Sequence, residues 1–395
     1  MSAATVHRDA DVRSRARWYF ATLRSWATVT SLAVAPLALL IALLAMVIQS
    51  GRSGSDFATF WESGNSVLRG ASPFPAVSSL PQVADRTSFL PFVYPPPAAF
   101  LMVPLSLLPF SIANVLLFFV NVGSIGLALR FLGVRDWRCY GIAFLCAPVV
   151  AALLIGTISP LLLLGVAAAW RYRERTLLLG VLVAGVVALK LFLWPLGIWL
   201  LGARRRSAAV VAGVTVVVTT LGAWLAIGFS GFREYPRLLG RLTELVGTNS
   251  YSSYALQRAA GVSSSAAQLA LIAVSIVLAI ATAISFRRQR DEASLLVAAI
   301  GIALLTTPIL WPHYLVLLFV PVAFASRTLS ALWLLPLLLW LDATTWSNGE
   351  PVRIIPVLVG TLVIICIALR RSGRRPAAIP VPRAPAYQPA LPSFE

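Results

Sequence analysis

Residues 29–47 read VTSLAVAPLALLIALLAMV, an uncharged run near the start of the chain that decides its class of fold. A helix needs about 20 such residues to cross the hydrocarbon core of a bilayer. Similar runs follow at 210–229 and 267–284. Because lipid offers backbone groups no hydrogen-bond partner, segments of this kind cross membranes as helices. The sequence therefore predicts an all-α polytopic membrane protein.

The composition of the whole chain supports this class. Of its 395 residues, 59% are hydrophobic and 12% are charged, whereas soluble domains carry about 25% charged residues. The net charge of +18 comes from arginines in short linkers between apolar runs, which is the positive-inside pattern of membrane proteins. The charge is thus explained by membrane lipid and topology, and we expect no nucleic-acid partner. The clusters are Arg13, Arg15 and Arg17; Arg171, Arg173 and Arg175; 204–206; Arg287, Arg288 and Arg290; and Arg370, Arg371, Arg374 and Arg375.

The apolar runs divide the chain into about 12 crossings of roughly 20 residues each. Both termini are rich in arginine, so both are expected on the cytoplasmic side. We interpret 1–26 as a cytoplasmic N-terminal tail, 27–370 as one transmembrane domain, and 371–395 as a cytoplasmic, disordered tail. Two longer polar intervals, about 50–93 and 230–262, are expected to be extracytoplasmic loops.

Two topologies are open between residues 94 and 202. In the first, 94–109 is a short crossing, the arginines at 171–175 lie outside, and 176–202 is one long helix. In the second, 94–109 is re-entrant, those arginines lie inside, and 176–202 is a helical hairpin with Lys190 at its outer tip. We favour the first topology, because it keeps 94–109 as an ordinary crossing.

The two outer intervals mix aromatic and polar residues at helical spacing. Phe57, Phe60 and Trp61, followed by Val67 and Leu68, predict an amphipathic helix in the membrane interface. In the second interval, Tyr235, Leu238, Leu239, Leu242 and Leu245 follow the same period.

Asp56 is the leading catalytic candidate. It lies just beyond the first apolar run, and a carboxylate at the outer membrane surface can take a proton from an attacking sugar hydroxyl on a lipid-carried substrate. The alternative is a helix N-cap, because Asp56 precedes a helix-like run. The two interpretations are compatible.

Lys190 is the only lysine of the chain, and it lies in the apolar stretch 186–194. A cation in a membrane segment costs about 2.5–3.5 kcal/mol on insertion scales and usually faces a cavity or a partner. A phosphate is the obvious partner, and a lysine reaching to the interface is the alternative. We favour the phosphate.

His313 follows Trp311 and Pro312, and the only other histidine is His7. Its imidazole is suited to a phosphate or a hydroxyl, and a packing histidine in an aromatic belt is an equal alternative. The weaker candidates supply donors, acceptors or aromatic faces, and each is more often structural than functional. They are Glu62, Arg69, Tyr94, Asn249, Tyr251, Ser252, Tyr254, Gln257 and Arg258. The spacing of the three cysteines predicts neither a disulfide framework nor a metal site.

A series of short motifs resembles glycosyltransferase family 87. The first runs from Asp56-Phe57 through Arg69-Gly70 to Tyr94-Pro95-Pro96. Gly156-Thr157-Ile158-Ser159 is similar to a Gly-Gln-x-Asn step, and Lys190 with Pro195 to a Lys-x-x-Pro segment. The polar loop 250–258 and Trp311-Pro312-His313-Tyr314 complete the order, over roughly residues 30–325. The sequence departs from the family pattern at Thr157, which replaces Gln, and at Phe60 and Phe74, which replace Tyr.

This resemblance implies a GT-C fold and a membrane glycosyltransferase of the cell membrane that needs no cofactor. The implied reaction is inverting transfer of a sugar, mannose first of all, from a polyprenyl-phosphate sugar to a glycolipid or lipid-linked glycan on the extracytoplasmic face. Asp56 corresponds to the general base, and Lys190 and His313 to positions near the donor phosphate, where Arg69 is a further candidate. Glu62, Tyr94, Tyr251, Gln257 and Arg258 are expected to contact substrate.

Two alternatives differ from this reaction. One is an arabinofuranosyltransferase that uses a polyprenyl-phosphate donor, and the other is a lipid-sugar flippase or transporter. Transporter folds often carry paired repeats with broken helices at matching positions, and no such pairing is evident in the sequence.

Overall fold

The computed structural model describes residues 27–51, 56–80, 91–285, 291–341 and 347–372. These residues form helices and no strand, so the predicted all-α membrane class is confirmed. The predicted N-terminal tail, the predicted C-terminal tail from residue 373 on and the arginines at 287–290 lie outside the described residues.

Most helices match the apolar runs of the sequence. Within the described residues, five helices are long and apolar enough to cross a membrane, or six if the pair α6 and α7, bent by 64°, counts as one. The first of the five covers 27–49 and includes α2 (Ala35–Gln49). The other four are α5 (Phe110–Phe131), α11 (Arg206–Ala226), α14 (Ser264–Ser285) and α18 (Pro351–Ser372). The shorter elements are α4 (Pro96–Ser106), α6 (Trp137–Leu145), α7 (Ala147–Ile155), α8 (Ser159–Arg171), α9 (Thr176–Leu189), α10 (Leu196–Gly202), α15 (Glu292–Thr306), η5 (Pro312–Leu318), α16 (Phe319–Ala325), α17 (Ala331–Leu334) and η6 (Leu335–Trp340).

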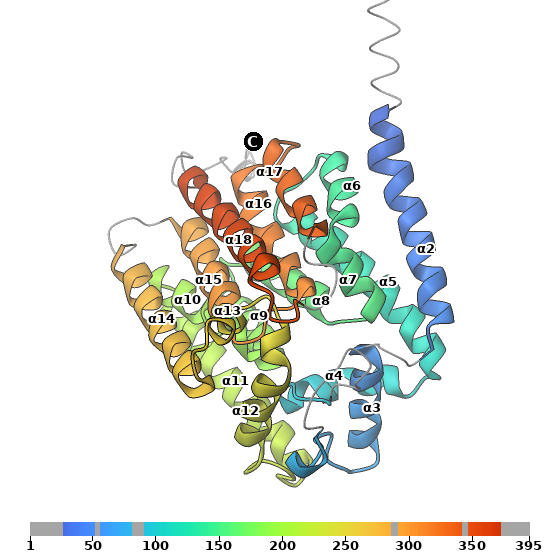
Figure 1. Cartoon of the computed structure of the whole chain (residues 1–395), viewed down its shortest axis with the longest axis vertical. Helices are drawn as coiled ribbons and strands as arrows, with labels where there is room; N and C mark the ends of the chain where they lie inside the picture. Colours follow the sequence, from blue (N-terminus) through green and yellow to red (C-terminus); the bar gives the residue numbers. More distant parts are fainter. Residues whose placement is uncertain (1–26, 52–55, 81–90, 286–290, 342–346, 373–395) are drawn as a thin grey trace, which may run out of the picture.

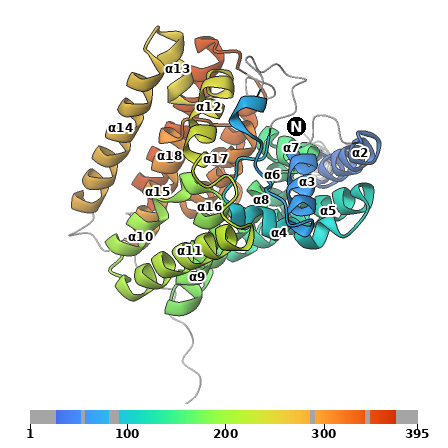
Figure 2. The same ribbon diagram turned by 90° about the horizontal axis from the view of Figure 1, so that it is seen from below.

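The two outer intervals contribute helices at one end of the molecule. α3 (Asp56–Leu68) and α12 (Tyr235–Val246) have the amphipathic spacing expected of them, and α13 (Ser253–Ala259) follows α12. In Figure 1, α3, α4 and α12 lie at the end opposite to α6, α16 and α17. Figure 2, seen from that end, shows α2 and α14 at opposite edges of the bundle.

The segment 176–202 is not one helix, which corrects the favoured topology. α9 ends at Leu189, the backbone of Lys190 is extended at φ −152° and ψ 104°, and the 3-10 turn η3 (Leu191–Leu193) leads into α10. Pro195 explains the break, because its ring lacks an N–H and clashes with the preceding turn of a helix.

The arginines at 171–175 and 204–206 lie on the same side of the bundle, which is a second correction. The Arg205 guanidinium donates to the carbonyl oxygen of Arg173 at 2.7 Å and to Glu292 at 3.0 Å, and Arg173 pairs with Glu292 at 3.4 Å. α9 is 14 residues long, or about 21 Å, so the chain must run out and back between these ends. Lys190 therefore lies at the far turn of a hairpin, as the second topology predicted.

α4 is too short to cross a bilayer by itself. Its 11 residues rise about 16 Å, against about 30 Å of hydrocarbon. Its end is attached to α3, where Ser106 Oγ donates to the Trp61 carbonyl at 2.8 Å and Trp61 Nε1 donates to the Leu108 carbonyl at 3.1 Å. An ordinary crossing at 94–109 would have put 171–175 on the side opposite to 204–206, so the same-side position of these arginines contradicts it. Pro95 and Pro109 bound the short helix at both ends.

Candidate active site

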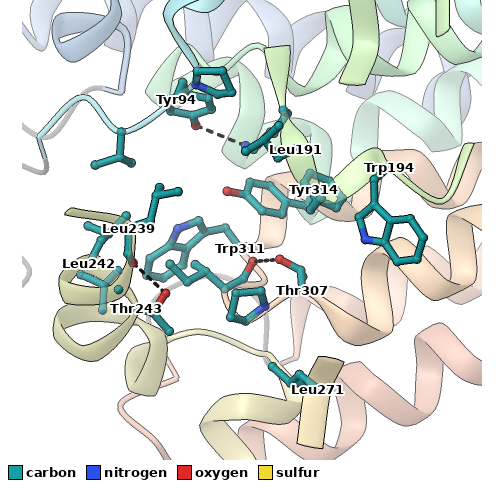
Figure 3. A pocket seen from close by; sticks show the side chains of 18 of the residues that line it. Tyr94, Leu191, Trp194, Leu239, Leu242, Thr243, Leu271, Thr307, Trp311 and Tyr314 are labelled. Atoms are coloured by element: carbon teal, nitrogen blue, oxygen red, sulfur yellow. Dashed lines mark hydrogen bonds between the residues drawn. The ribbon is translucent and has the colours of Figure 1, made fainter. Parts of the chain in front are cut away.

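A cavity of about 600 Å³ lies between the helices α3 and α12 and the rest of the helix bundle. Its walls come from the start of α3, residues 91–95, the break at 190–194, α12, α14 and residues 306–314. Most of the lining is aliphatic or aromatic, and Figure 3 shows Tyr94, Tyr314 and Trp311 facing its interior. Segments far apart in the sequence thus build one site. Each contributes lining side chains from a helix end, a loop or one face of a helix.

The side of the cavity next to α14 reaches the apolar surface of the molecule. Leu191 is 45% exposed, Trp194 44% and Ile272 57%, and all three line the cavity. The buried share of α14 is small, so this helix is a thin wall between the cavity and the surroundings of the bundle.

Lys190 lies inside this cavity with 6% of its surface exposed. Its ammonium donates a hydrogen bond to the Tyr94 hydroxyl at 3.2 Å. The Nζ atom also lies 3.6 Å from the ring centroid of Tyr314 and 4.7 Å from that of Tyr94. The break after α9 explains this position, because it turns the lysine away from the helix surface and into the space beneath α3.

Tyr314 is fixed by its own neighbours. Its ring stacks on Phe192 at 5.1 Å and an interplanar angle of 7°. It belongs to η5, which begins at Pro312, and Figure 3 shows its ring between Tyr94 and Trp311. Tyr94 in turn packs against Phe60 of α3 at 4.6 Å. The two tyrosines therefore form a rigid aromatic clamp around the ammonium group.

Asp56 lines the same cavity from the first turn of α3 and is partly buried. Burial raises the pKa of its carboxyl to about 6, although the charge of Lys190 opposes the shift. Among the described residues, Asp56 and Lys190 do not form an ion pair with nitrogen and oxygen within 4.0 Å. The acid and the cation therefore share the cavity without direct contact.

Gly156 allows the first turn of α3 to pack closely against the end of α7. Its φ of +69° is left-handed, and a Cβ built on it would lie 2.7 Å from Cβ of Phe57. The Gly156-Thr157-Ile158-Ser159 step thus lets α3 approach α7 closely. Asn121 holds the step by donating from Nδ2 to the Thr157 carbonyl at 2.9 Å.

Tyr94 remains a neutral phenol at physiological pH. Burial, the nearby hydroxyl of Tyr314 and the charge of Asp56 all raise the pKa of Tyr94 well above its ordinary value. It can accept a hydrogen bond from Lys190 without neutralising its charge.

His313 is 3% exposed and does not line the cavity. Its ring meets the edge of Tyr314 at 4.7 Å, and its Nε2 atom has no hydrogen-bond partner among the described residues. The imidazole therefore lies behind the aromatic clamp.

The remaining candidates lie outside the cavity lining. Arg69 and Glu62 pair with each other at 2.8 Å on the surface of α3. In the polar loop, the amide N–H of Tyr251 donates to the Leu310 carbonyl at 2.9 Å. The side chains of Gln257 and Arg258 donate to the carbonyls of Ser253 and Val262. The Tyr251 contact fixes the loop against the segment that leads to Tyr314, and the contacts of Gln257 and Arg258 stay within the loop.

Sequence reasoning did not single out Tyr314, Trp311 or Thr243, all of which line the cavity. The motif Trp311-Pro312-His313-Tyr314 contains two of them, but the rarity of histidine in the chain indicated His313 as the candidate instead of the aromatic residues. Thr243 lies within the amphipathic pattern of α12, where periodicity does not distinguish a cavity face from a core face. Within the described ranges, no group of three His, Cys, Asp or Glu side chains could hold a metal ion.

Comparison with known proteins gives a family and two relatives. The model of glycosyltransferase family 87 matches residues 92–312. Over 280 residues, the chain is 30% identical to proteins from Mycolicibacterium smegmatis and Mycobacterium tuberculosis. Each is named polyprenol-phosphate-mannose-dependent alpha-(1-2)-phosphatidylinositol pentamannoside mannosyltransferase. The match covers 65% of this chain and spans 63% and 60% of the length of these relatives.

No solved structure is significantly similar to the chain. The family model nevertheless covers more than half of the sequence and includes Tyr94, Lys190 and Trp311 of the cavity. The chain therefore belongs to glycosyltransferase family 87.

Proposed function

We propose that this protein is a membrane mannosyltransferase that moves mannose from a polyprenyl-phosphate carrier to a lipid-linked glycan. The observation that carries the proposal is that Asp56 and Lys190 line one largely apolar cavity without pairing with each other. A transferase for a phosphate-activated sugar needs one base for the acceptor and one cation for the leaving phosphate. The names of the two relatives support mannose as the sugar.

The proposed donor fits the chemistry of the cavity. A polyprenyl phosphate combines a long apolar chain with an anionic headgroup. The exposed side chains of Leu191, Trp194 and Ile272 at the rim suit the chain, and the ammonium of Lys190 suits the phosphate. A buried cation with no acid in direct contact gains most from such an anion, because the pair is formed in a poorly hydrated site.

In the proposed step, the Asp56 carboxylate takes the proton of the acceptor hydroxyl as its oxygen attacks the anomeric carbon. The bond from that carbon to the phosphate oxygen breaks, and the phosphate leaves with the bonding electron pair. Lys190 stabilises the charge that develops on it. A single displacement of this kind inverts the anomeric centre and needs no protein nucleophile.

The proposal includes a GT-C arrangement with the site on the extracytoplasmic side. The clustered Arg173 and Arg205 favour the cytoplasm under the positive-inside rule, and Lys190 lies at the opposite turn of its hairpin. In this proposal the two legs of 176–202 count as separate crossings, and α4 does not count, because its end is attached to α3. The total is then about 12, of which five or six are full-length spans among the described residues and the rest are shorter helices.

The test is a transfer assay with the purified full chain in lipid nanodiscs. Polyprenyl-phosphate mannose and polyprenyl-phosphate arabinose are offered in parallel, with phosphatidylinositol mannosides as acceptors. We expect a mannosylated lipid product that forms with wild-type protein and not with the Asp56→Asn variant. Transfer of arabinose alone would replace the proposed sugar. Movement of the intact donor across the membrane without any product would replace the enzyme by a transporter.

A further inference from the structure

The sharpest unexplained feature of the site is the placement of a lysine and an aspartate in one buried cavity without an ion pair. In a poorly hydrated space, an ammonium and a carboxylate attract each other strongly. The observed position of Lys190 is nevertheless set by two tyrosines, at 3.2 Å from the Tyr94 hydroxyl and 3.6 Å from the Tyr314 ring centroid. Something in the site must therefore compete with Asp56 for the lysine.

We propose that Tyr314, together with Tyr94, is a positioning residue that holds the Lys190 ammonium away from Asp56 and so keeps the carboxylate free to act as a base. This inference rests on the proposed transferase function. In the absence of donor, the ring face of Tyr314 and the hydroxyl of Tyr94 take the place of the phosphate. When donor binds, its phosphate becomes the partner of Lys190.

The geometry gives the clamp its rigidity. Tyr314 is supported from one side by its stack on Phe192 and from another by the edge of His313. Tyr94 is held between Phe60 and Phe92, at 4.6 Å and 5.8 Å. Neither ring can follow the lysine toward Asp56 without breaking these contacts. Cation–π attraction is strongest where the cation has lost its water, as it has at 6% exposure.

Both tyrosines suit this role because they attract the cation without neutralising it. A carboxylate in place of either would form a salt bridge with Lys190 and weaken its hold on a phosphate. An aliphatic side chain would offer the ammonium nothing, and Asp56 would then be its best partner. The clamp therefore separates an acid from a cation inside one cavity.

The charged and titratable groups around Asp56 come from several neighbouring helices and loops. Lys190 acts on it from the break after α9, Tyr94 from the segment before α4, and Tyr314 from η5. His313 lies behind Tyr314, and the pair Glu62–Arg69 lies on the exposed side of α3. Of these groups, Lys190 is the cation that lines the cavity together with Asp56, so its movement would bring a positive charge onto the carboxylate.

The first experiment measures kcat against pH for three variants of the full chain in nanodiscs. In Tyr314→Leu we expect Lys190 to pair with Asp56, so that kcat falls at least tenfold and the acidic limb of its pH profile moves to lower pH. Tyr314→Phe keeps the ring and should retain most of the activity and the wild-type limb. Tyr172→Leu removes a ring at the end of α8 that does not line the cavity, and it serves as the matched control.

A double variant separates this effect from simple misfolding. If the shift of the acidic limb arises from Lys190, it must vanish when Tyr314→Leu is compared with wild type in a Lys190→Met background. A shift of the same size in that background would overturn the proposal, because it would come from packing rather than from the lysine.

The second experiment needs no activity, because Lys190 is the only lysine of the chain. Biosynthetic labelling with lysine enriched in ¹³C at Cε gives one lysine signal in an NMR spectrum. The ring of Tyr314 should shift its Hε protons upfield of those of free lysine. Tyr314→Leu should remove this shift, and Tyr314→Phe should preserve it.

The two readouts also distinguish the failure of this inference from that of the proposed function. A wild-type protein that transfers no mannose but shows the ring-shifted lysine signal would disprove the function and leave the clamp in place. An active enzyme whose lysine signal and pH profile are unchanged in Tyr314→Leu would disprove the clamp.

Discussion

Gly156 and Phe57 are in such close contact that a single methyl group would not fit between them. A Cβ on Gly156 would lie 2.7 Å from Cβ of Phe57, and the φ of +69° disfavours any other residue there. Because Phe57 follows Asp56 directly, this contact sets the position of the carboxylate. We expect Gly156→Ala to reduce kcat at least tenfold by displacing the start of α3, with a smaller effect on the KM for donor.

The control for this prediction is Gly126→Ala in α5, where a Cβ meets nothing within 4 Å. That change should leave activity intact and stabilise the helix by about 0.5–1 kcal/mol. Equal activity in both variants would show that the contact between Gly156 and Phe57 does not position Asp56.

Asp56→Asn should abolish transfer while donor binding stays near normal. The amide keeps the shape of the side chain but cannot take a proton, and loss of an acid–base group costs about 10²–10⁴-fold in rate. Initial rates and donor titration by intrinsic tryptophan fluorescence measure the two effects. Turnover close to wild type would leave Asp56 with a capping role alone.

The raised pKa of Asp56 predicts how activity depends on pH. The base must be ionised, and burial raises its pKa to about 6, so kcat/KM should fall about tenfold per unit below pH 6 and level off above it. Lys190→Met removes the charge that opposes this shift, and it should therefore move the limb to higher pH. A profile that is flat between pH 4.5 and 7 would argue against Asp56 as the base.

The raised pKa of Asp56 also makes the free energy of unfolding depend on pH. The folded state binds the Asp56 proton more tightly than the unfolded state, so this group lowers the free energy of unfolding as pH rises from about 4 to about 6. In Asp56→Asn this part of the pH dependence should disappear from thermal unfolding curves.

Lys190→Met tests whether the lysine serves a substrate or the fold. Removing a buried cation should leave the melting temperature unchanged or raise it, because the cost of placing a charge in the membrane disappears. We expect the KM for donor to rise and kcat to fall, with protein yield unaffected. Lys190→Arg should recover part of the activity, since the wider guanidinium binds phosphate in a different geometry. Full activity in Lys190→Met would remove this residue from the site.

Cysteine labelling tests the hairpin between Arg173 and Arg205. In a background without the three native cysteines, Arg175→Cys and Arg204→Cys should react with an impermeant maleimide from the cytoplasmic side alone. Ser72→Cys, near the start of α12 through its bond to the Ser230 carbonyl, should react from the opposite side alone. Labelling of Arg175→Cys and Arg204→Cys from different sides would exclude the hairpin.

The sequence predicted the class of fold because apolar length and charge-poor composition depend only on local residues. It also predicted helices at the positions of α3 and α12, since the periodicity of their apolar residues is likewise a local property. It did not settle the path of 176–202, because the strongly apolar run predicts one continuous helix there. Pro195 breaks that helix. The ion pairs of Arg205 with Glu174 and Glu292 decide that path, and they join residues far apart in the sequence.

The candidate site was predictable to the extent that its residues were rare. Lys190 and Asp56 stand out against an apolar background, and the structure brings both to one cavity. Tyr314 does not stand out among the aromatic residues of the chain, and its role depends on a distance to Lys190 that no local pattern encodes. His313 was conspicuous for its rarity, yet its ring lies behind the cavity wall.

The position of Lys190 at the turn of a hairpin also bears on how the protein is made. Ribosomes deliver the chain from its N-terminus, so this lysine reaches the membrane well before the segment that carries Tyr314 exists. The hairpin must therefore be inserted before the ring of Tyr314 can cover the charge, and a turn at the end of the hairpin keeps that ammonium closer to water than a position within the span would. The cavity is completed by the late segment around Tyr314, so a nascent chain holds its acid, its cation and Tyr94 long before it holds the second tyrosine of the clamp.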